Sequence, residues 1–336
     1  MMKNYEETIE KLKKYNQNEI VNIMSKVYTE EENERLIEQL NRIDLNQVMN
    51  LYKNANNIPL IDERKIEHIE YTDLNSLSEE KFKEYKNIGI DVIKNNKYAV
   101  ITMAGGQGTR LGHKGPKGTF DIGLDSHKSL FELLCDSLKE AGKKYDVTIP
   151  WFIMTSRENN HDTVEFFKKN KYFGYEKNIY FFIQGQLPMI DTEGKILIGE
   201  DGLIKEAADG HGGVYESLVK SGMVNKMKEL GVEWVFIGGV DNCLVKMVDP
   251  VLMGIAIDKH VTAAGKSVVK ANPYEKVGVF CRRNGKPNVI EYSEITEEMA
   301  EAVDEKGELL YGESHILCNL FNISAIERMG SQPLPY

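Results

Sequence analysis

Two patterns of apolar positions divide the chain near residue 95. Residues 1–95 are rich in Lys, Glu and Asn, and apolar residues recur there at helical spacing, as in Ile9, Leu12, Ile20 and Ile23. Because residues at that spacing share one side of a helix, the pattern predicts amphipathic helices packed on a larger body. A helical arm that binds a partner is the alternative. The packing role is favoured, since such stripes usually belong to a core.

From Tyr98 onward, short apolar runs alternate with glycine-rich loops and helical stretches. This alternation predicts an α/β domain over residues 96–330, with a mostly parallel sheet whose strands are buried on both faces. Hairpin signals at Glu193-Gly194-Lys195 and Asn284-Gly285-Lys286 indicate that part of the sheet is antiparallel. The expected strands are Tyr98–Met103, Trp151–Thr155, Ile179–Ile183, Trp234–Val240, Ser267–Lys270, Val277–Arg282 and Asn288–Tyr292, and the expected helices include Leu130–Glu140, Thr163–Lys169 and Val214–Glu229.

Charge and composition narrow the function classes. A formal net charge of -10 over 336 residues argues against a basic nucleic-acid-binding protein, although it leaves room for a nucleotide pocket. No apolar run approaches the roughly 20 residues that a membrane helix needs. The four cysteines are far apart, without a CxxC pair, so scattered thiols of a reducing compartment are expected. With no signal peptide at the N-terminus, we expect a cytoplasmic protein with neither a nucleic-acid nor a membrane partner.

The loop that follows the first expected strand contains the strongest candidate for a ligand-binding site. Gly105-Gly106-Gln107-Gly108-Thr109-Arg110-Leu111-Gly112 continues to Pro116-Lys117. Closely spaced glycines allow the backbone to approach a ligand and to present N–H groups to phosphate or to a base. Arg110 and Lys117 add the fixed positive charge that nucleotidyl transfer requires. The alternative is a structural glycine turn with two solvated cations.

Two familiar phosphate motifs fail at this loop. The Walker pattern has no match there, and the dinucleotide fingerprint GxGxxG places Leu111 where its third glycine belongs. The residues from Gly112 to Gly118 also cannot begin a helix cleanly. A nicotinamide-dependent oxidoreductase is therefore disfavoured.

The loop resembles the signature of the UDP-sugar pyrophosphorylases, and most closely that of the UDP-N-acetylglucosamine pyrophosphorylases. The resemblance runs over about residues 95–325. It includes Phe182-Ile-Gln-Gly-Gln-Leu-Pro-Met189, Ala208-Asp-Gly-His-Gly-Gly-Val-Tyr215, the segment from Val240 to Pro250, Val277-Gly-Val-Phe-Cys-Arg282 and Val289-Ile-Glu-Tyr-Ser-Glu294. It implies a Rossmann-like nucleotidyltransferase fold of the GT-A type, a mixed sheet flanked by helices, behind the N-terminal helical region.

The resemblance also implies roles for particular residues. It implies that Arg110 and Lys117 are the catalytic residues. It also implies that Asp241, which follows an apolar strand, binds a divalent cation (Mg²⁺ or Mn²⁺). A capping role for Asp241 is the alternative. Gln184 would read the base and Gly210 would lie by the uridine. The implied sets are nucleotide-binding Ala104, Gly105, Gly106, Gly108, Thr109, Gln184, Gly210 and His211, and sugar-binding Gly278, Glu291 and Asn319.

The expected reaction joins UTP and a sugar 1-phosphate to give a UDP-sugar and pyrophosphate. N-acetylglucosamine 1-phosphate is the favoured acceptor. His211 departs from the Asn typical of those enzymes, so glucose 1-phosphate and galactose 1-phosphate stay open. The sequence ends at Tyr336, before the lysine-rich segment and small C-terminal domain of the family. The family's C-terminal domain is therefore expected to be absent. A shortened form that binds UDP-sugar with little activity is the remaining alternative.

Overall fold

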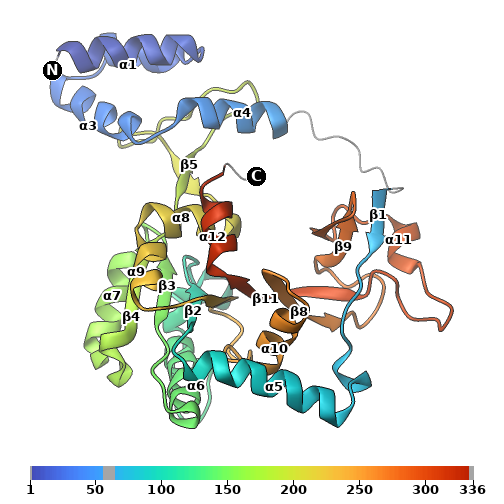
Figure 1. Ribbon diagram of the computed structural model, residues 1–336. Coiled ribbons are helices and arrows are strands. Elements are labelled where there is room, and N and C mark those ends of the chain that lie inside the picture. The colour runs from blue at the N-terminus through green and yellow to red at the C-terminus, as the bar shows by residue number, and fades with distance from the viewer. Residues whose placement is uncertain (1, 56–64, 333–336) are drawn as a thin grey trace. The chain divides into compact units, whose positions relative to one another are not determined.

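The computed structural model describes residues 2–55 and 65–332, which form two compact units (Figure 1). The smaller unit contains residues 2–55, 184–216 and 332, and the larger contains residues 65–183 and 217–331. This division differs from a boundary at residue 95. Residues 65–94 belong to the larger unit, and the smaller unit takes a segment from the middle of the chain.

Four parallel strands form one half of the larger unit's sheet. They lie in the order β7-β2-β3-β4, and every residue of β2, β3 and β7 is buried. Their bounds are β2 (Tyr98–Met103), β3 (Trp151–Thr155), β4 (Ile179–Ile183) and β7 (Trp234–Gly239). The predicted mostly parallel core is confirmed. Because β3 lies on one side of β2 and β7 on the other, strand order reverses at β2, where α/β sheets bind ligands.

The other half of the sheet is antiparallel. Strand β11 (Glu313–Asn322) pairs with β7, β8 (Ala263–Val269) and β9 (Val279–Arg283), and β9 also pairs with β10 (Lys286–Ile290) and β1 (Ile66–His68). The hairpin predicted at Asn284-Gly285 joins β9 to β10, and both residues have positive φ, 54° and 73°. Strand β11 was not predicted. It contains a register shift between His315 and Asn319, where Leu317 has φ 54°.

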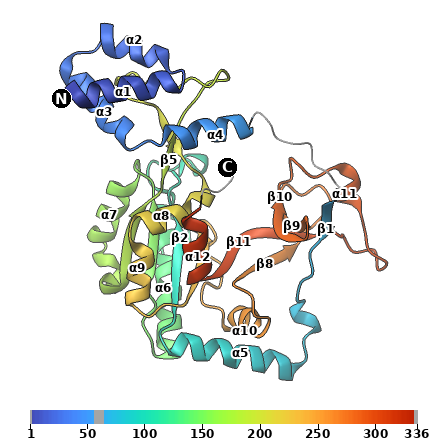
Figure 2. The same ribbon diagram turned by 45° about the horizontal axis from the view of Figure 1, so that its top comes forward.

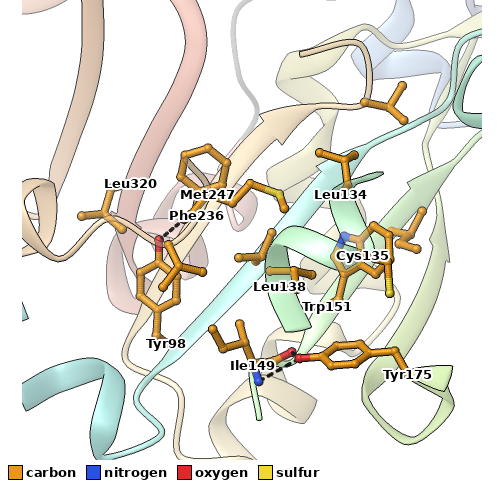
Figure 3. Close-up of a cluster of buried hydrophobic side chains, with 14 of the residues drawn as sticks. Tyr98, Leu134, Cys135, Leu138, Ile149, Trp151, Tyr175, Phe236, Met247 and Leu320 are labelled. Carbon is orange, nitrogen blue, oxygen red and sulfur yellow. Dashed lines mark hydrogen bonds between the residues drawn. The ribbon is translucent and has the colours of Figure 1, made fainter. Parts of the chain in front are cut away.

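Helices supply the cover for the sheet. Side chains of α5 (Glu79–Lys94), α6 (Leu130–Tyr145), α7 (Asn160–Lys169) and α10 (Pro250–Asp258) join alternate strand residues in one core cluster. In that cluster Tyr98 donates to the Met247 carbonyl at 2.5 Å and Tyr175 to the Ile149 carbonyl at 2.8 Å (Figure 3). The intervening strand residues are buried as well, so both faces are covered. Among the described residues, no helix combines the length and apolarity that crossing a bilayer requires.

The predicted helix Val214–Glu229 is broken into α8 (Val214–Lys220) and α9 (Met223–Glu229), because Gly222 adopts φ 76°. Lys228 of α9 forms a 2.6 Å ion pair with Glu327 of α12 (Ile323–Gly330). The remaining short helices of the larger unit are η2 (Leu74–Ser76), η3 (Thr109–Leu111), η4 (Lys117–Thr119), η5 (Lys171–Gly174), η6 (Glu176–Asn178) and α11 (Glu297–Glu301).

Helices α5 and α10 cross at two glycines (Figure 1). A Cβ at Gly89 would lie 1.9 Å from the Pro250 carbonyl oxygen, and one at Gly254 would lie 1.9 Å from the Tyr85 carbonyl oxygen. Only glycine permits so close an approach. The crossing therefore holds the first turn of α10, which directly follows the loop that leaves β7, against α5.

The smaller unit is built on the predicted amphipathic helices: α1 (Met2–Lys14), α2 (Asn18–Lys26), α3 (Glu30–Asn41) and α4 (Leu45–Ala55) (Figure 2). Their buried side chains, Leu12, Leu36 and Leu40 among them, form one cluster with Ile196 and Ile204 of the middle segment. That segment contains the antiparallel pair β5 (Gln186–Pro188) and β6 (Glu206–Ala208), followed by η7 (His211–Gly213). Within the smaller unit, the helices thus pack on a folded insertion from the middle of the chain.

Candidate active site

The glycine loop continues the buried strand β2 and then turns back on itself. Ala104 is buried, and its N–H donates to the Met154 carbonyl at 2.7 Å, which extends the parallel ladder by one residue. Farther on, Gly108 N–H donates to the Gly115 carbonyl at 2.9 Å and Lys117 N–H to the Gly106 carbonyl at 3.0 Å. Gly105 is half-buried at the first turn. The loop is therefore a closed hydrogen-bonded turn with no α-helix after it, unlike a dinucleotide-binding loop.

Gly106 and Gly108 differ in the space that each has for a side chain. A Cβ at Gly108 would lie 2.8 Å from the His113 Cβ, so the imidazole packs where a side chain would stand. Around Gly106 the nearest atom to a built Cβ is the Lys117 Cε at 3.9 Å, and the residue is exposed. Gly108 is needed for the turn itself, whereas Gly106 leaves backbone accessible to a ligand.

Asn159 holds the loop from below, and sequence reasoning missed it. Its side chain is fully buried, and its Nδ2 donates to the Ala104 carbonyl at 2.8 Å and to the Gly106 carbonyl at 3.3 Å. Its Oδ1 accepts from Ser156 N–H at 2.8 Å. A polar residue between a strand and a helix usually caps the helix. No local signal shows that this one reaches a loop 55 residues earlier.

Lys117 and Asp241 meet beside this loop. The Lys117 Nζ lies 3.1 Å from the Asp241 Oδ2, although the two residues are 124 positions apart. Strand β7 brings Asp241 there: Val240 N–H donates to the Met103 carbonyl at 3.1 Å, and a Cβ at Gly239 would lie 2.8 Å from the Asp241 Oδ1. The carboxylate is 60% exposed and the lysine 27%. A cation and a carboxylate thus share the ligand-binding edge of the sheet.

Thr109 and Arg110 lie on η3, at the outer side of the same loop, and both are exposed. Within the described part of the chain, no hydrogen bond or ion pair joins Arg110 to Lys117 or Asp241. The structure therefore brings Lys117, but not Arg110, into direct contact with the carboxylate.

The loop that carries Asp241 is anchored at its far end by Asp249. This residue caps α10, where its Oδ1 accepts from Val251 N–H at 3.0 Å, and its Oδ2 pairs with the Lys266 Nζ at 2.6 Å. Burial by itself would raise the pKa of Asp249, but the Lys266 and Lys246 ammonium groups hold it below its usual value. Asp249 ends a loop as an N-cap and fixes the segment from Val240 to Val248.

The three residues assigned to the base lie together in the smaller unit. Gln184 is 7% exposed, and its Nε2 donates to the Gly210 carbonyl at 2.7 Å. Gly210 has φ 77°, a conformation that favours glycine. His211 follows at the start of η7 with its side chain exposed. The Asp209 carboxylate lies behind them, since a Cβ at Gly185 or at Gly213 would come within 2.2 Å of it.

The sugar candidates are linked through His315. A Cβ at Gly278 would lie 3.2 Å and 3.3 Å from the two Glu291 carboxylate oxygens, so Glu291 extends over that glycine. His315 N–H donates to the Gly278 carbonyl at 2.8 Å, and its ring lies 3.3 Å from the Asn319 Nδ2. Asn319 Oδ1 also lies 3.2 Å from a Cβ built at Gly265. Sequence reasoning missed His315, because strand β11, on which residues four apart share a face, was not predicted.

A sequence profile of the UTP–glucose-1-phosphate uridylyltransferase family matches residues 49–333. The chain belongs to this family. It is 34% identical to UDP-N-acetylglucosamine diphosphorylase 2 of Arabidopsis thaliana over 96% of this chain and 68% of the relative. With the UDP-N-acetylglucosamine pyrophosphorylase of Saccharomyces cerevisiae it shares 40% identity over 74% of this chain and 53% of the relative.

A solved structure extends the similarity to the fold. The uridine diphosphate N-acetylglucosamine pyrophosphorylase from Trypanosoma brucei, in complex with an inhibitor, superposes with a TM-score of 0.82 at 29% identity. The match covers 98% of this chain and 69% of the T. brucei chain. The predicted fold class and family resemblance are therefore confirmed. The chain spans between 53% and 69% of the length of these three relatives.

Proposed function

We propose that the chain transfers the uridylyl group of UTP to a sugar 1-phosphate, with N-acetylglucosamine 1-phosphate as the preferred acceptor. The observation that carries this proposal is the 3.1 Å contact between the Lys117 Nζ and the Asp241 Oδ2 beside the glycine loop. The names of the three relatives, each a UDP-N-acetylglucosamine pyrophosphorylase or diphosphorylase, support the acceptor. The products are a UDP-sugar and pyrophosphate.

The chemistry asks little of the protein beyond positioning and charge. A phosphate oxygen of the sugar 1-phosphate attacks the α-phosphorus of UTP in line, and the bond from that phosphorus to the bridging oxygen breaks. Pyrophosphate leaves with the bonding electrons. Because the attacking oxygen is already ionised, no side chain has to remove a proton. Lys117 offsets the charge that builds on the α-phosphate, and Arg110 adds charge along the polyphosphate.

The residues present fit a divalent cation that arrives with the nucleotide. No group of three or more His, Cys, Asp or Glu side chains arranged for a metal occurs in the described ranges. Mg²⁺ commonly uses only one or two carboxylates and completes its shell with phosphate oxygens and water. Asp241, exposed at the end of β7, matches that arrangement. The cation, Mg²⁺ or Mn²⁺, would neutralise phosphate charge.

Each remaining candidate has a task in this proposal. The backbone from Ala104 to Thr109 cradles the phosphates, Gln184 and Gly210 recognise the uracil, and His211 flanks them. Glu291 and Asn319 bind sugar hydroxyls above Gly278. Four free cysteines support a reducing, cytoplasmic setting for the enzyme. His211, in place of the Asn typical of the N-acetylglucosamine enzymes, keeps glucose 1-phosphate and galactose 1-phosphate as second candidates.

The test is pyrophosphate release from UTP and Mg²⁺ with each of the three sugar phosphates. We expect kcat/KM for N-acetylglucosamine 1-phosphate to exceed the others by about tenfold, as differential contacts to one substituent allow. ATP replaces UTP as the control. A preference for glucose or galactose 1-phosphate would overturn the acceptor. UDP-sugar binding in calorimetry without turnover would overturn catalysis, and thermal protection by NADH alone would overturn the class.

A further inference from the structure

The pair Gln184 and Gly210 stands at the end of a very short stem. Strands β5 and β6 align over only three residue pairs, from Gln186 with Ala208 to Pro188 with Glu206, and Asp209 N–H donates to the Gly185 carbonyl at 3.2 Å. An isolated two-stranded ladder of this length is marginally stable in water at best. The segment continues past these pairs through backbone hydrogen bonds of its own, such as Met189 N–H to the Lys205 carbonyl at 2.8 Å. Contacts from outside the segment can therefore stabilise the stem further.

Two buried glutamines of the N-terminal helices do this with paired hydrogen bonds. Gln39 of α3 donates from its Nε2 to the Ile204 carbonyl at 2.8 Å and accepts on its Oε1 from Ile204 N–H at 2.8 Å. Gln17, which precedes α2, donates to the Gly194 carbonyl at 2.9 Å and accepts from Ile196 N–H at 2.9 Å. They are 5% and 2% exposed. Each amide thus serves the insertion as another strand's peptide group would.

Two tyrosines hold the turns of the same insertion. Tyr28 donates to the Gly202 carbonyl at 2.8 Å, and Tyr52 donates to the Thr192 carbonyl at 2.8 Å with its ring against Gly194. Gly194 and Gly202 both have positive φ, 80° and 76°. Gln39 Nε2 also lies 2.8 Å from the Glu206 Oε2, inside β6 itself. These contacts run from the helices to within four residues of Gly210.

We propose that α1–α4 are a positioning element for base recognition, in which Gln39 and Gln17 hold the β5–β6 stem so that Gln184 and Gly210 are preorganised for the uracil. This inference rests on the proposed function, because it takes the base as the group that Gln184 and Gly210 bind. It makes Gln17 and Gln39 positioning residues that do not touch substrate. Their loss should weaken the binding of uridine nucleotides and leave the chemical step unchanged.

The test substitutions are Gln39→Met and Gln17→Met, which keep the side-chain length and remove the amide's hydrogen bonds to the insertion. Gln47→Met is the matched control, because Gln47 is a half-buried residue of α4. We expect KM for UTP to rise about fivefold or more in either test variant, with kcat and the KM for sugar 1-phosphate within about twofold of the parent. Binding of UMP by calorimetry should weaken in parallel, whereas binding of pyrophosphate should not.

Amide hydrogen exchange without ligand separates this inference from the proposed function. Residues 184–186 and 206–210 should exchange faster in Gln39→Met than in the parent or in Gln47→Met, whether or not the chain releases pyrophosphate. If Gln39→Met does not fold, Tyr28→Phe removes one hydroxyl and keeps the ring, and it should show a smaller change of the same kind. Unchanged exchange in a folded variant, or KM values for both substrates that rise together with a fall in kcat, would overturn the inference.

Discussion

The two halves of the larger unit's sheet hold their site residues in different ways. In the parallel half, β2, β3 and β7 are buried along their whole length, and backbone hydrogen bonds place Gly106, Lys117 and Asp241 at the strand ends. In the antiparallel half, β8 and β10 are largely exposed or half-buried. There the Glu294 carboxylate accepts from Glu291 N–H at 3.1 Å, and the Asn319 amide lies 3.3 Å from the His315 ring. The proposed phosphate site thus rests on a buried framework, and the proposed sugar site rests on strands that are more exposed.

Substitution of Lys117 should lower the rate of pyrophosphate release without unfolding the protein. For Lys117→Ala we expect kcat to fall about 100- to 1,000-fold, the loss seen when one preorganised charge-stabilising group is deleted. Stability should hardly change, because the ion pair with Asp241 is exposed. Pyrophosphate release measures the rate and thermal unfolding measures the stability. Lys114→Ala, in an exposed position of the same loop, is the control. An unchanged rate would remove Lys117 from the mechanism.

Lys266 links the two halves, because it lies on β8 and pairs with Asp249 behind the Asp241 loop. Lys266→Met leaves the buried carboxylate without its nearest cation and should cost about 3 kcal/mol of folding free energy near neutral pH. The folded-state pKa of Asp249 is lowered. The stability that this group contributes is therefore complete above its unfolded pKa of about 3.9 and is lost as pH falls through the lower folded value.

The pH dependence makes that prediction specific. The difference in unfolding free energy between the parent and Lys266→Met should be largest near neutral pH and should shrink as the pH falls to about 4 and below. Denaturant titrations at a series of pH values measure it. The exposed pair of Lys83 and Glu79, 3.5 Å apart, offers Lys83→Met as a control with little effect. A difference independent of pH would mean that Lys266 stabilises the fold by packing alone.

The same contrast explains what the sequence could predict. Strands β2, β3 and β4 were predicted with their observed bounds, because each is a nearly continuous apolar run. Strands β2 and β3 are buried along their whole length, whereas β4 is mostly half-buried. Strand β11 was not predicted, since its pairing with β7, β8 and β9 is decided by distant partners and its shift leaves Leu317 at φ 54°. The role of Asn159 could not be predicted for a related reason. Its hydrogen bonds reach a loop that only the folded sheet brings near.

The candidate site residues, too, could be predicted where the signal is local and could not where it depends on distant partners. The glycine loop could be recognised from the local spacing of its residues. The contact between Lys117 and Asp241 depends instead on β2 and β7 being parallel neighbours. The sequence placed both residues in one site through the family resemblance. It could not show that the smaller unit joins segments far apart in the chain, because Gln17 and Gln39 give no local sign of partners more than 160 residues away.

Glu291 tests the antiparallel half and should give the smallest effect. Its carboxylate oxygens extend over Gly278, where they can accept hydrogen bonds from sugar hydroxyls. Glu291→Gln keeps the shape and replaces one acceptor by a donor. We therefore expect KM for the sugar 1-phosphate to rise about tenfold, the cost of one hydrogen bond to a charged group, with KM for UTP unchanged. Glu298→Gln, on the exposed side of α11, makes the same charge change away from the site. If KM for UTP rose as well, the two halves would not divide nucleotide from sugar, and the comparison itself would fail.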